Sequence, residues 1–168
     1  MRLKMAMALL GASLMLNLTA CQSAGSSTKL IAGAFNASTE IQKKLIDQHA
    51  PQGVRVQADI QYMQNPDLHI DLYQPADIAA LGARPAIVWI HGGGWISGSK
   101  EHAQGYFKRL ADQGYNVVSV QYQFAPDVIY PAQLQQINQA LAFITAHAGQ
   151  YQIDAGKLYL AGDSAGAN

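Results

Sequence analysis

The sequence predicts an α/β protein with a mostly parallel sheet, helices on the faces of that sheet and an antiparallel hairpin at one edge. Two observations predict the sheet. Residues 54–62 and 68–75 alternate apolar and polar side chains around a turn at 65–67, which is typical of two half-exposed strands near an edge. Three later segments are apolar strands: residues 85–90 and 115–122, both expected to be buried on both faces, and residues 157–162.

A third observation, the alternation of strand and helix, makes the sheet parallel. Residues 102–114 and 131–149 have helical patterns between the apolar strands, and such alternation predicts helices that cross the faces of a parallel sheet. Pro131 lies near the first turn of the second helix, whose inward stripe we expect to contain Leu134, Ile137, Leu141 and Ile144. A shorter helix is expected over residues 39–50, with Thr39 and Gln42 as a capping box, ended by Pro51 and Gly53.

The first 20 residues have the pattern of a signal peptide, in which Arg2 and Lys4 precede an apolar run too short to span a bilayer comfortably. The run ends in Leu18-Thr19-Ala20-Cys21, which resembles the lipobox of bacterial lipoproteins. The resemblance implies cleavage before Cys21, acylation of that cysteine and export to the cell envelope. Gln22 after the cysteine favours the outer membrane. The alternative is an ordinary secretory peptide with an incidental cysteine. We therefore divide the chain into a signal peptide at 1–20, a lipidated, flexible tether at 21–37 and the folded domain at 38–168.

Composition narrows the classes of function. The 168 residues are 49% hydrophobic and 13% charged with no formal net charge, as in an ordinary globular domain, and no cluster of Lys and Arg suggests nucleic-acid binding. Cys21 is the only cysteine, so an intramolecular disulfide is excluded. His49, His69, His102 and His147 lack metal-ligand spacing and are interpreted as surface residues.

The first motif with chemical meaning is Gly162-Asp163-Ser164-Ala165-Gly166, directly after an apolar strand. A Gly-x-Ser-x-Gly turn between strand and helix raises a serine nucleophile on a strained bend, and only glycines fit at its flanks. Ser164 is therefore the candidate nucleophile. Asp163 adjoins it, but neighbours in sequence point apart around such a bend, so we expect Asp163 to contact nearby backbone or solvent.

The second motif, His91-Gly92-Gly93-Gly94-Trp95, follows the apolar strand at 85–90. Consecutive glycines allow backbone amides to converge on an oxygen, and the amide of Ala165 follows the nucleophile, so we expect the two motifs together to form an oxyanion hole. We interpret His91 as a residue that orders this loop and not as a base. Trp95 is expected either to line an acyl pocket or to pack behind the loop.

Taken together, HGGGW followed by GDSAG resembles the α/β-hydrolase esterases of the hormone-sensitive-lipase and carboxylesterase type. The segments IDLYQP and VQYQFAPDVIYPAQ are similar to other family segments, and the resemblance covers about residues 59–168. It implies hydrolysis of small carboxylic esters through an acyl-enzyme intermediate, without a metal or organic cofactor. Carried over to this sequence, the resemblance implies Ser164 as the nucleophile and the backbone amides of Gly93, Gly94 and Ala165 as the oxyanion hole. Relatives often carry an acidic residue early in the helix after Pro131, where this chain has Gln135, Gln136 and Asn138.

The order of the catalytic residues raises one more expectation. In this fold the triad runs Ser, then Asp or Glu, then His, and no histidine follows Ser164 here. We therefore expect the chain to be the front portion of a longer esterase, inactive and unstable by itself, with residues 157–162 as an exposed apolar edge. The alternative functions are an amidase or arylformamidase, a peptidase on the same fold, or a binding scaffold without catalysis. Short acyl esters, acetylated sugars and feruloyl esters all stay open as substrates.

Overall fold

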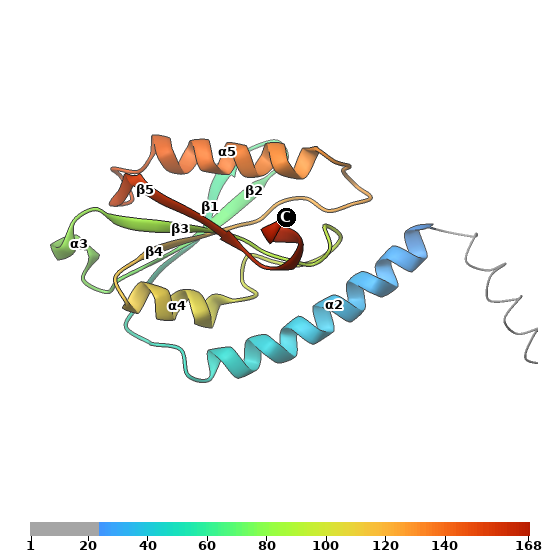
Figure 1. The fold of residues 1–168 in the computed structure, drawn as a ribbon, viewed down its shortest axis with the longest axis horizontal. Coiled ribbons are helices and arrows are strands. Elements are labelled where there is room, and N and C mark those ends of the chain that lie inside the picture. The colour runs from blue at the N-terminus through green and yellow to red at the C-terminus, as the bar shows by residue number, and fades with distance from the viewer. Residues whose placement is uncertain (1–23) are drawn as a thin grey trace, which may run out of the picture.

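A computed structural model describes residues 24–168 of the protein, so the predicted signal peptide and Cys21 lie outside the described residues. Five strands form one sheet in the order β1-β2-β4-β3-β5, with β1 and β5 at its edges (Figure 1). The strands are β1 (Arg55–Met63), β2 (Leu68–Gln74), β3 (Arg84–Ile90), β4 (Asn116–Val120) and β5 (Ile153–Gly162). β2 pairs antiparallel with β1 and β4, whereas β3 pairs parallel with β4 and β5. The predicted α/β class and its edge hairpin are confirmed.

Helices cover both faces of this sheet. α5 lies on one face, and α4 lies on the other with α2 outside it (Figure 1). A short helix, α3, connects β2 to β3, and a 3-10 turn, η1, follows β5. The bounds are α2 (Ala24–Asp47), α3 (Ile78–Leu81), α4 (Gln104–Asp112), α5 (Ala132–Ala146) and η1 (Ser164–Ala167).

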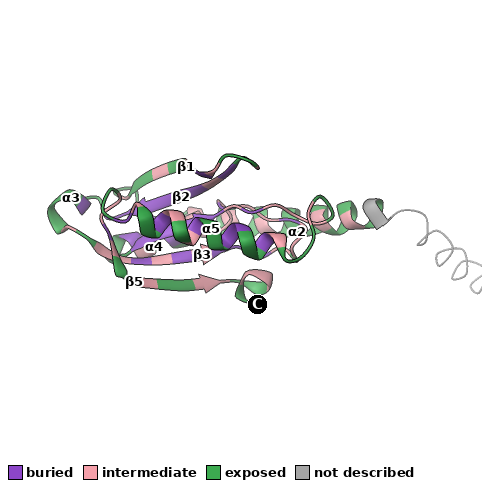
Figure 2. Ribbon diagram, turned by 90° about the horizontal axis from the view of Figure 1, so that it is seen from above, coloured by how far each residue is buried: buried purple, intermediate pink, exposed green. Residues whose placement is uncertain are grey.

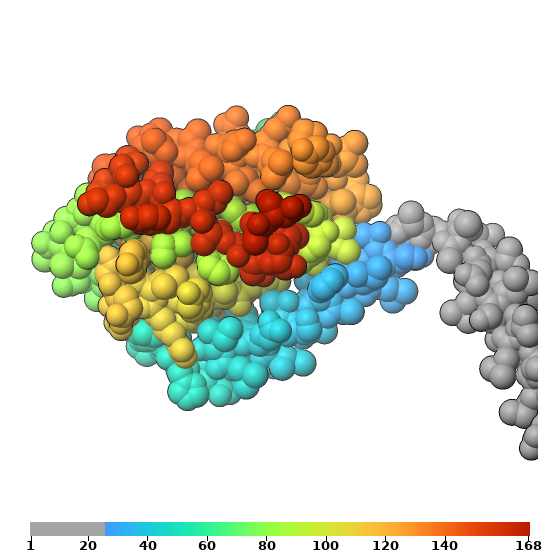
Figure 3. Space-filling view, viewed as in Figure 1, coloured from blue at the N-terminus to red at the C-terminus, as the bar shows by residue number. Residues whose placement is uncertain are grey.

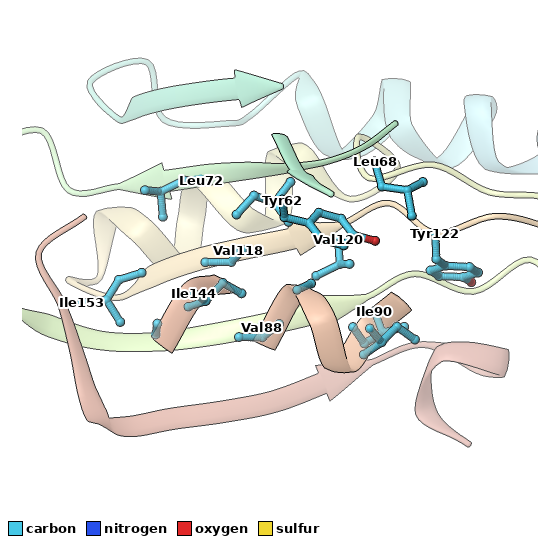
Figure 4. Packing of buried hydrophobic residues seen from close by; sticks show 14 of the residues in the cluster. Tyr62, Leu68, Leu72, Val88, Ile90, Val118, Val120, Tyr122, Ile144 and Ile153 are labelled. Carbon is cyan, nitrogen blue, oxygen red and sulfur yellow. The ribbon is translucent and has the colours of Figure 1, made fainter. Parts of the chain in front are cut away.

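Apolar side chains are buried between the sheet and each helical layer. The larger cluster packs α5 residues such as Ile144 against Val88, Ile90 and Val118 of the central strands (Figure 4). The smaller cluster lies on the opposite face, where Phe107 of α4 contacts Tyr73 with ring centroids 5.4 Å apart. Burial of this apolar surface is the main force that holds the layers together.

Two strand predictions need correction. β2 was expected to be half-exposed, but all of its residues except His69 are buried, because β2 lies between β1 and β4 and its side chains enter the apolar clusters on both faces of the sheet. Its polar residues have partners, since Gln74 donates to Asn116 Oδ1 at 3.1 Å. β3 was expected to be buried on both faces, yet only alternate residues, including Val88 and Ile90, are fully buried.

The inward stripe of α5 is also rotated from the prediction. Ile137 and Ile144 are buried as expected, but Leu134 is 37% exposed and Leu141 only partly buried. Gln133, Gln136 and Ala140 are buried in their place. Gln136 is tolerated there because its side chain bonds Gln123 twice, with its Oε1 accepting from the Gln123 backbone N–H and its amide donating to Gln123 Oε1. The hydrophobic pattern alone cannot reveal such polar pairing.

The N-terminal helix is much longer than predicted. α2 begins at Ala24, so part of the expected flexible tether is helical and the predicted boundary at 37/38 falls inside this helix. The predicted capping box is wrong because Thr39 lies mid-helix, where its hydroxyl donates to the Phe35 carbonyl at 2.8 Å. Helix formers such as Leu30 and Ala34 extend the helix backwards, and a single Gly33 does not stop it. The helix ends before Pro51 as expected.

At the other edge of the sheet, β5 pairs only with β3 among the described residues, and much of it is exposed (Figure 2). Tyr159 and Leu160 are 55% and 64% exposed. The expected exposed apolar edge is present in the structure. Within residues 24–168, no helix has both the length and the apolar character needed to cross a bilayer.

Candidate active site

The two glycine motifs meet because β3 and β5 are parallel neighbours in register. Ile90 is the last residue of β3 and pairs with Gly162, the last residue of β5. The His91 loop and the Asp163 bend therefore leave the sheet at the same level, beside one another (Figure 1). This is the carboxyl edge of the parallel strands, where ligand sites form in open α/β sheets.

Ser164 adopts the strained conformation expected of a nucleophile on a tight bend. Its φ is +50°, in the left-handed region that non-glycine residues rarely occupy. The flanking glycines are required by close backbone contact. A Cβ on Gly162 would lie 2.4 Å from the Gly166 carbonyl oxygen, and a Cβ on Gly166 would lie 2.1 Å from that of Ile90. No described residue forms a hydrogen bond with the Ser164 side chain, so its hydroxyl is not tied to a structural partner in residues 24–168.

Gly92 allows the glycine loop to lie directly against Ser164. A Cβ on Gly92 would be 3.0 Å from the Ser164 Cβ and 2.9 Å from the Asp163 carbonyl oxygen. Any side chain at this position would separate the two motifs. The third glycine, Gly94, has a φ of +64°, which turns the loop away from the strand.

Asp163 joins the loop and the bend. Its Oδ1 accepts hydrogen bonds from the Gly92 backbone N–H and from the Trp89 indole N–H, each at 3.1 Å. Its own backbone N–H donates to the Ile90 carbonyl at 3.3 Å. The expectation that this carboxylate contacts nearby backbone is confirmed, and the contact fixes the spacing between loop and nucleophile.

Three backbone amides near Ser164 have no acceptor in the described part of the chain. They belong to Gly93, Gly94 and Ala165, the residues predicted to hold an oxyanion. The Gly93 carbonyl, by contrast, accepts three hydrogen bonds: two from the Ile96 and Ser97 backbone N–H groups and one from the Ser97 hydroxyl. The loop is therefore anchored through its carbonyl side while its N–H groups stay available.

His91 lies beneath the loop and is almost completely buried. Its Nδ1 is 2.7 Å from the Gly92 carbonyl, which can only accept, so Nδ1 carries the proton. The ring stacks on Tyr122 with centroids 4.3 Å apart. Burial lowers the pKa of His91 to about 4, so the ring is neutral near pH 7. A buried ring held in this way orders the loop.

An ion cluster around the buried Lys100, after the loop, was not predicted from the sequence. The Lys100 ammonium contacts Asp59 at 2.9 Å, Asp71 at 3.0 Å and also Glu101. Burial by itself would lower the pKa of Lys100, but hydrogen bonds to these three carboxylates outweigh it and raise that pKa. The cluster ties the segment after the loop to the β1–β2 hairpin. Only the tertiary fold brings these charges together, so no local pattern could have revealed them.

Ser164 opens into a cavity of about 530 Å³. One wall comes from the two glycine motifs, namely Gly92, Gly93, Asp163 and Ser164. The opposite wall comes from α2, namely Phe35, Ser38, Thr39, Gln42 and Ile46. His102 also lines this cavity and is not a surface residue as predicted. Burial lowers its pKa, and no described residue hydrogen-bonds to its side chain.

Trp95 lies on the other side of the glycine loop. It packs on Tyr122 with ring centroids 5.2 Å apart and lines a second cavity of about 410 Å³ with Tyr130 and Leu134. The predicted packing of Trp95 behind the loop is therefore confirmed, and its role in an acyl pocket stays a prediction. Within residues 24–168, no group of three or more His, Cys, Asp or Glu side chains is arranged to hold a metal ion.

Residues 70–168, more than half of the chain, match the BD-FAE family. The chain belongs to this family. It is 32% identical over 107 residues to a probable isoprenylcysteine alpha-carbonyl methylesterase of Oryza sativa, covering 64% of this chain and 25% of that protein. It is 30% identical to the probable carboxylic ester hydrolase LipM of Mycobacterium tuberculosis, covering 60% of this chain and 23% of that protein.

Solved structures similar to this BD-FAE chain include several esterases. A structure of esterase B from Lactobacillus rhamnosis with a tributyrin phosphonate has a TM-score of 0.73 and 30% identity, covering 86% of this chain and 48% of that one. The fold is therefore that of the α/β-hydrolase esterases. The chain spans about half of that structure and about a quarter of the curated relatives.

Proposed function

We propose that this BD-FAE chain provides the nucleophile and the oxyanion hole of a serine carboxylesterase. The observation that carries the proposal is the contact between the two motifs, with Gly92 packed against Ser164 and three unpaired amides beside it. Relatives and solved neighbours named as esterases support ester substrates over amides or peptides.

In the proposed reaction, the Ser164 hydroxyl oxygen attacks the carbonyl carbon of the ester while a general base takes its proton. The carbonyl oxygen becomes an oxyanion that accepts hydrogen bonds from the amides of Gly93, Gly94 and Ala165. Each donor of this kind typically stabilises the transition state by about 2.7–4 kcal/mol. The intermediate expels the alcohol, which receives the proton, and water then hydrolyses the acyl group from Ser164.

We assign the general base and its carboxylate partner to residues after 168, in the order that this fold uses. The neutral ring of His91 is buried under the loop, and its Nδ1 is hydrogen-bonded to the Gly92 carbonyl. Both observations argue against His91 as the base. His102 lines the cavity but precedes the nucleophile in the chain. Substitution of His102 by Gln is thus expected to reduce activity far less than loss of Ser164.

The experiment measures hydrolysis of a short-chain aryl ester by the native-length protein that contains this chain. Ser164→Ala is expected to lower kcat by about 10³-fold or more, because the nucleophile is lost. Ser119→Ala is the matched control, since this buried hydroxyl on β4 has no hydrogen-bond partner in the described residues and does not line the cavity. Full activity in Ser164→Ala would overturn the proposal. Robust turnover by residues 1–168 alone would overturn the assignment of the base.

We also propose that Cys21 is acylated and anchors the protein in the cell envelope, in the outer membrane. The support is the lipobox sequence and the position of the single cysteine. Cys21→Ser is expected to move the protein from the membrane fraction to the soluble fraction of the cell. Equal membrane recovery of both forms after a high-salt wash would contradict this proposal.

A further inference from the structure

Helix α2 carries an apolar stripe that no described residue covers. Leu30, Ile41 and Leu45 are 77%, 65% and 62% exposed, and the exposed residues Ala34 and Ala37 lie between them. Their spacing of three to four residues places all five on one side of the helix. Large aliphatic side chains exposed in a row are uncommon on a monomer surface unless they meet something apolar.

The opposite side of α2 has a partner over the C-terminal half of the helix. Phe35, Thr39 and Ile46 line the cavity that contains Ser164, and Ile46 packs closely on Gly105 at the start of α4. Gln104 also donates to Asp47 Oδ2 at 2.7 Å. At Ile41 and Leu45 the apolar stripe is therefore the outward side of a docked helix. Leu30 lies in the N-terminal half of α2, where almost every described residue is exposed. In Figure 3 α2 runs along the border of the molecule, outside α4.

The charges beside the stripe suit a lipid surface. Lys29 and Lys44 flank it on one side with Glu40 between them, and all three are exposed. The flank thus carries one net positive charge next to the aliphatic side chains. Interfacial helices combine these two features, because aliphatic groups enter the boundary region while basic groups meet anionic headgroups.

The distance to Cys21 makes the bilayer the nearest apolar surface. Two residues lie between Cys21 and Ala24, where α2 begins, so the three steps along the chain span at most about 11 Å. The six helical steps from Ala24 to Leu30 add about 9 Å. An acylated Cys21 would hold the first residue of the stripe within roughly 20 Å of the lipid, whatever path the chain takes.

We propose that α2 lies on the membrane surface with Leu30, Ile41 and Leu45 in contact with lipid. This inference rests on the proposed acylation of Cys21, and it adds an orientation to that anchor. The same helix forms one wall of the Ser164 cavity, so the cavity lies about one helix diameter, roughly 10–12 Å, from the lipid surface. The site is thereby placed to receive esters that partition into the bilayer.

The test uses the full-length chain, processed in a bacterial host and reconstituted in vesicles of phosphatidylethanolamine and phosphatidylglycerol at about 3:1. Ile41→Cys carries an environment-sensitive fluorophore, and lipids with nitroxide labels report contact with the bilayer. The matched control carries the same label at Ile129→Cys, because Ile129 is an equally large side chain, 75% exposed, in the loop before α5. Lipid quenching at position 41 is expected to exceed that at position 129 by at least three-fold.

A second variant separates the stripe from the anchor. With Leu30→Glu and Leu45→Glu added, quenching at position 41 is expected to fall to the control level, while circular dichroism shows an unchanged fold. The mass of the N-terminal peptide reports acylation at Cys21. If it carries no adduct, the anchor and this inference both fail. If the adduct is present but positions 41 and 129 are quenched equally, only this inference fails. It also fails if position 41 is shielded from both lipid nitroxide and aqueous iodide, because protein then covers the stripe.

Discussion

The two walls of the Ser164 cavity are built in different ways. The glycine wall, formed by Gly92, Gly93, Asp163 and Ser164, is held by backbone contacts so close that a single added Cβ would fall within about 3 Å of its neighbours. The helical wall, formed by α2, meets the loop through side chains at ordinary distances, as where Phe35 lies 3.8 Å from the position of a Cβ on Gly94. The first wall should therefore be rigid and intolerant of change, and the second adaptable.

Because the two walls differ in rigidity, they suit different roles in the site. An oxyanion hole needs donors fixed within tenths of an ångström, which close backbone packing provides. A wall that meets variable acyl or alcohol groups needs only shape and apolar character. Substitutions of similar size should consequently cost much more on the glycine wall than on the helical wall.

The largest effect is expected from Gly166→Ala. Its Cβ would lie 2.1 Å from the Ile90 carbonyl oxygen and 2.8 Å from that of His91, so strand β3 or the bend must move. We expect the free energy of unfolding to fall by about 3 kcal/mol or more, with loss of esterase activity. Urea unfolding measures the first effect. Gly149→Ala is the control, because a Cβ there meets nothing within 4 Å, and an equal loss in both variants would contradict the close-packing explanation.

The next effect is the dependence of stability on pH through His91. Burial lowers its pKa to about 4 in the folded protein, against about 6.5 when unfolded, so the unfolded chain binds the extra proton between these values. The contribution of neutral His91 to the free energy of unfolding is fully present above pH 6.5. As the pH falls toward 4 this contribution is lost, and the free energy of unfolding falls by roughly 2–3 kcal/mol. Unfolding curves at pH 7.5 and 4.5 measure this slope. His91→Gln should flatten it, and an unchanged slope in that variant would refute the role of His91.

A smaller effect on stability and activity is expected at Asp163, which links the glycine loop to the bend. Asp163→Ala leaves the Gly92 and Trp89 N–H groups without their acceptor, which should cost about 1–3 kcal/mol of stability. We expect kcat to fall on the order of ten-fold with little change in KM, because the loop amides shift. Asp163→Asn retains one acceptor oxygen and should recover most of the activity. If Asn performs no better than Ala, the hydrogen bonds do not position the loop.

The smallest effect is expected on the helical wall. Phe35→Ala removes a ring that is 47% exposed, so the change in stability should stay below about 1 kcal/mol. KM for an aryl ester should rise a few-fold while kcat stays unchanged, since only the cavity wall is altered. Leu30→Ala, on the outward side of the same helix, should change neither constant in solution. A fall in kcat for Phe35→Ala would show that both walls take part in catalysis.

The glycine wall, together with the bend that carries Ser164, could be predicted from the sequence, whereas the helical wall could not. Gly162, Ser164 and Gly166 form a local steric unit, and an apolar strand before each motif is enough to place both at one edge of the sheet. The docking of α2 depends on contacts such as Ile46 on Gly105, between segments far apart in the chain. No local pattern encodes that pairing, so neither the length of α2 nor its place over the cavity was predicted.

Buried polar residues account for most of the remaining differences in the fold. Gln136 replaces an apolar residue on the inward side of α5, and Asp71 lies within a buried strand, because each has a partner from another element. Sequence patterns treat such residues as exposed, which made β2 appear half-exposed. His102 was missed for the same reason, since its place beside Ser164 depends on how α2 and α4 pack.

In the proposed site, the amides of Gly93, Gly94 and Ala165 converge on the oxyanion of the intermediate that is bonded to Ser164. A crystal structure of the native-length protein after reaction with a short-chain alkyl phosphonate tests it most directly. We predict phosphorus bonded to the Ser164 hydroxyl oxygen and one phosphonyl oxygen about 2.7–3.1 Å from these amide nitrogens. A phosphonyl oxygen turned toward solvent, or a phosphonate attached to another residue, would contradict it.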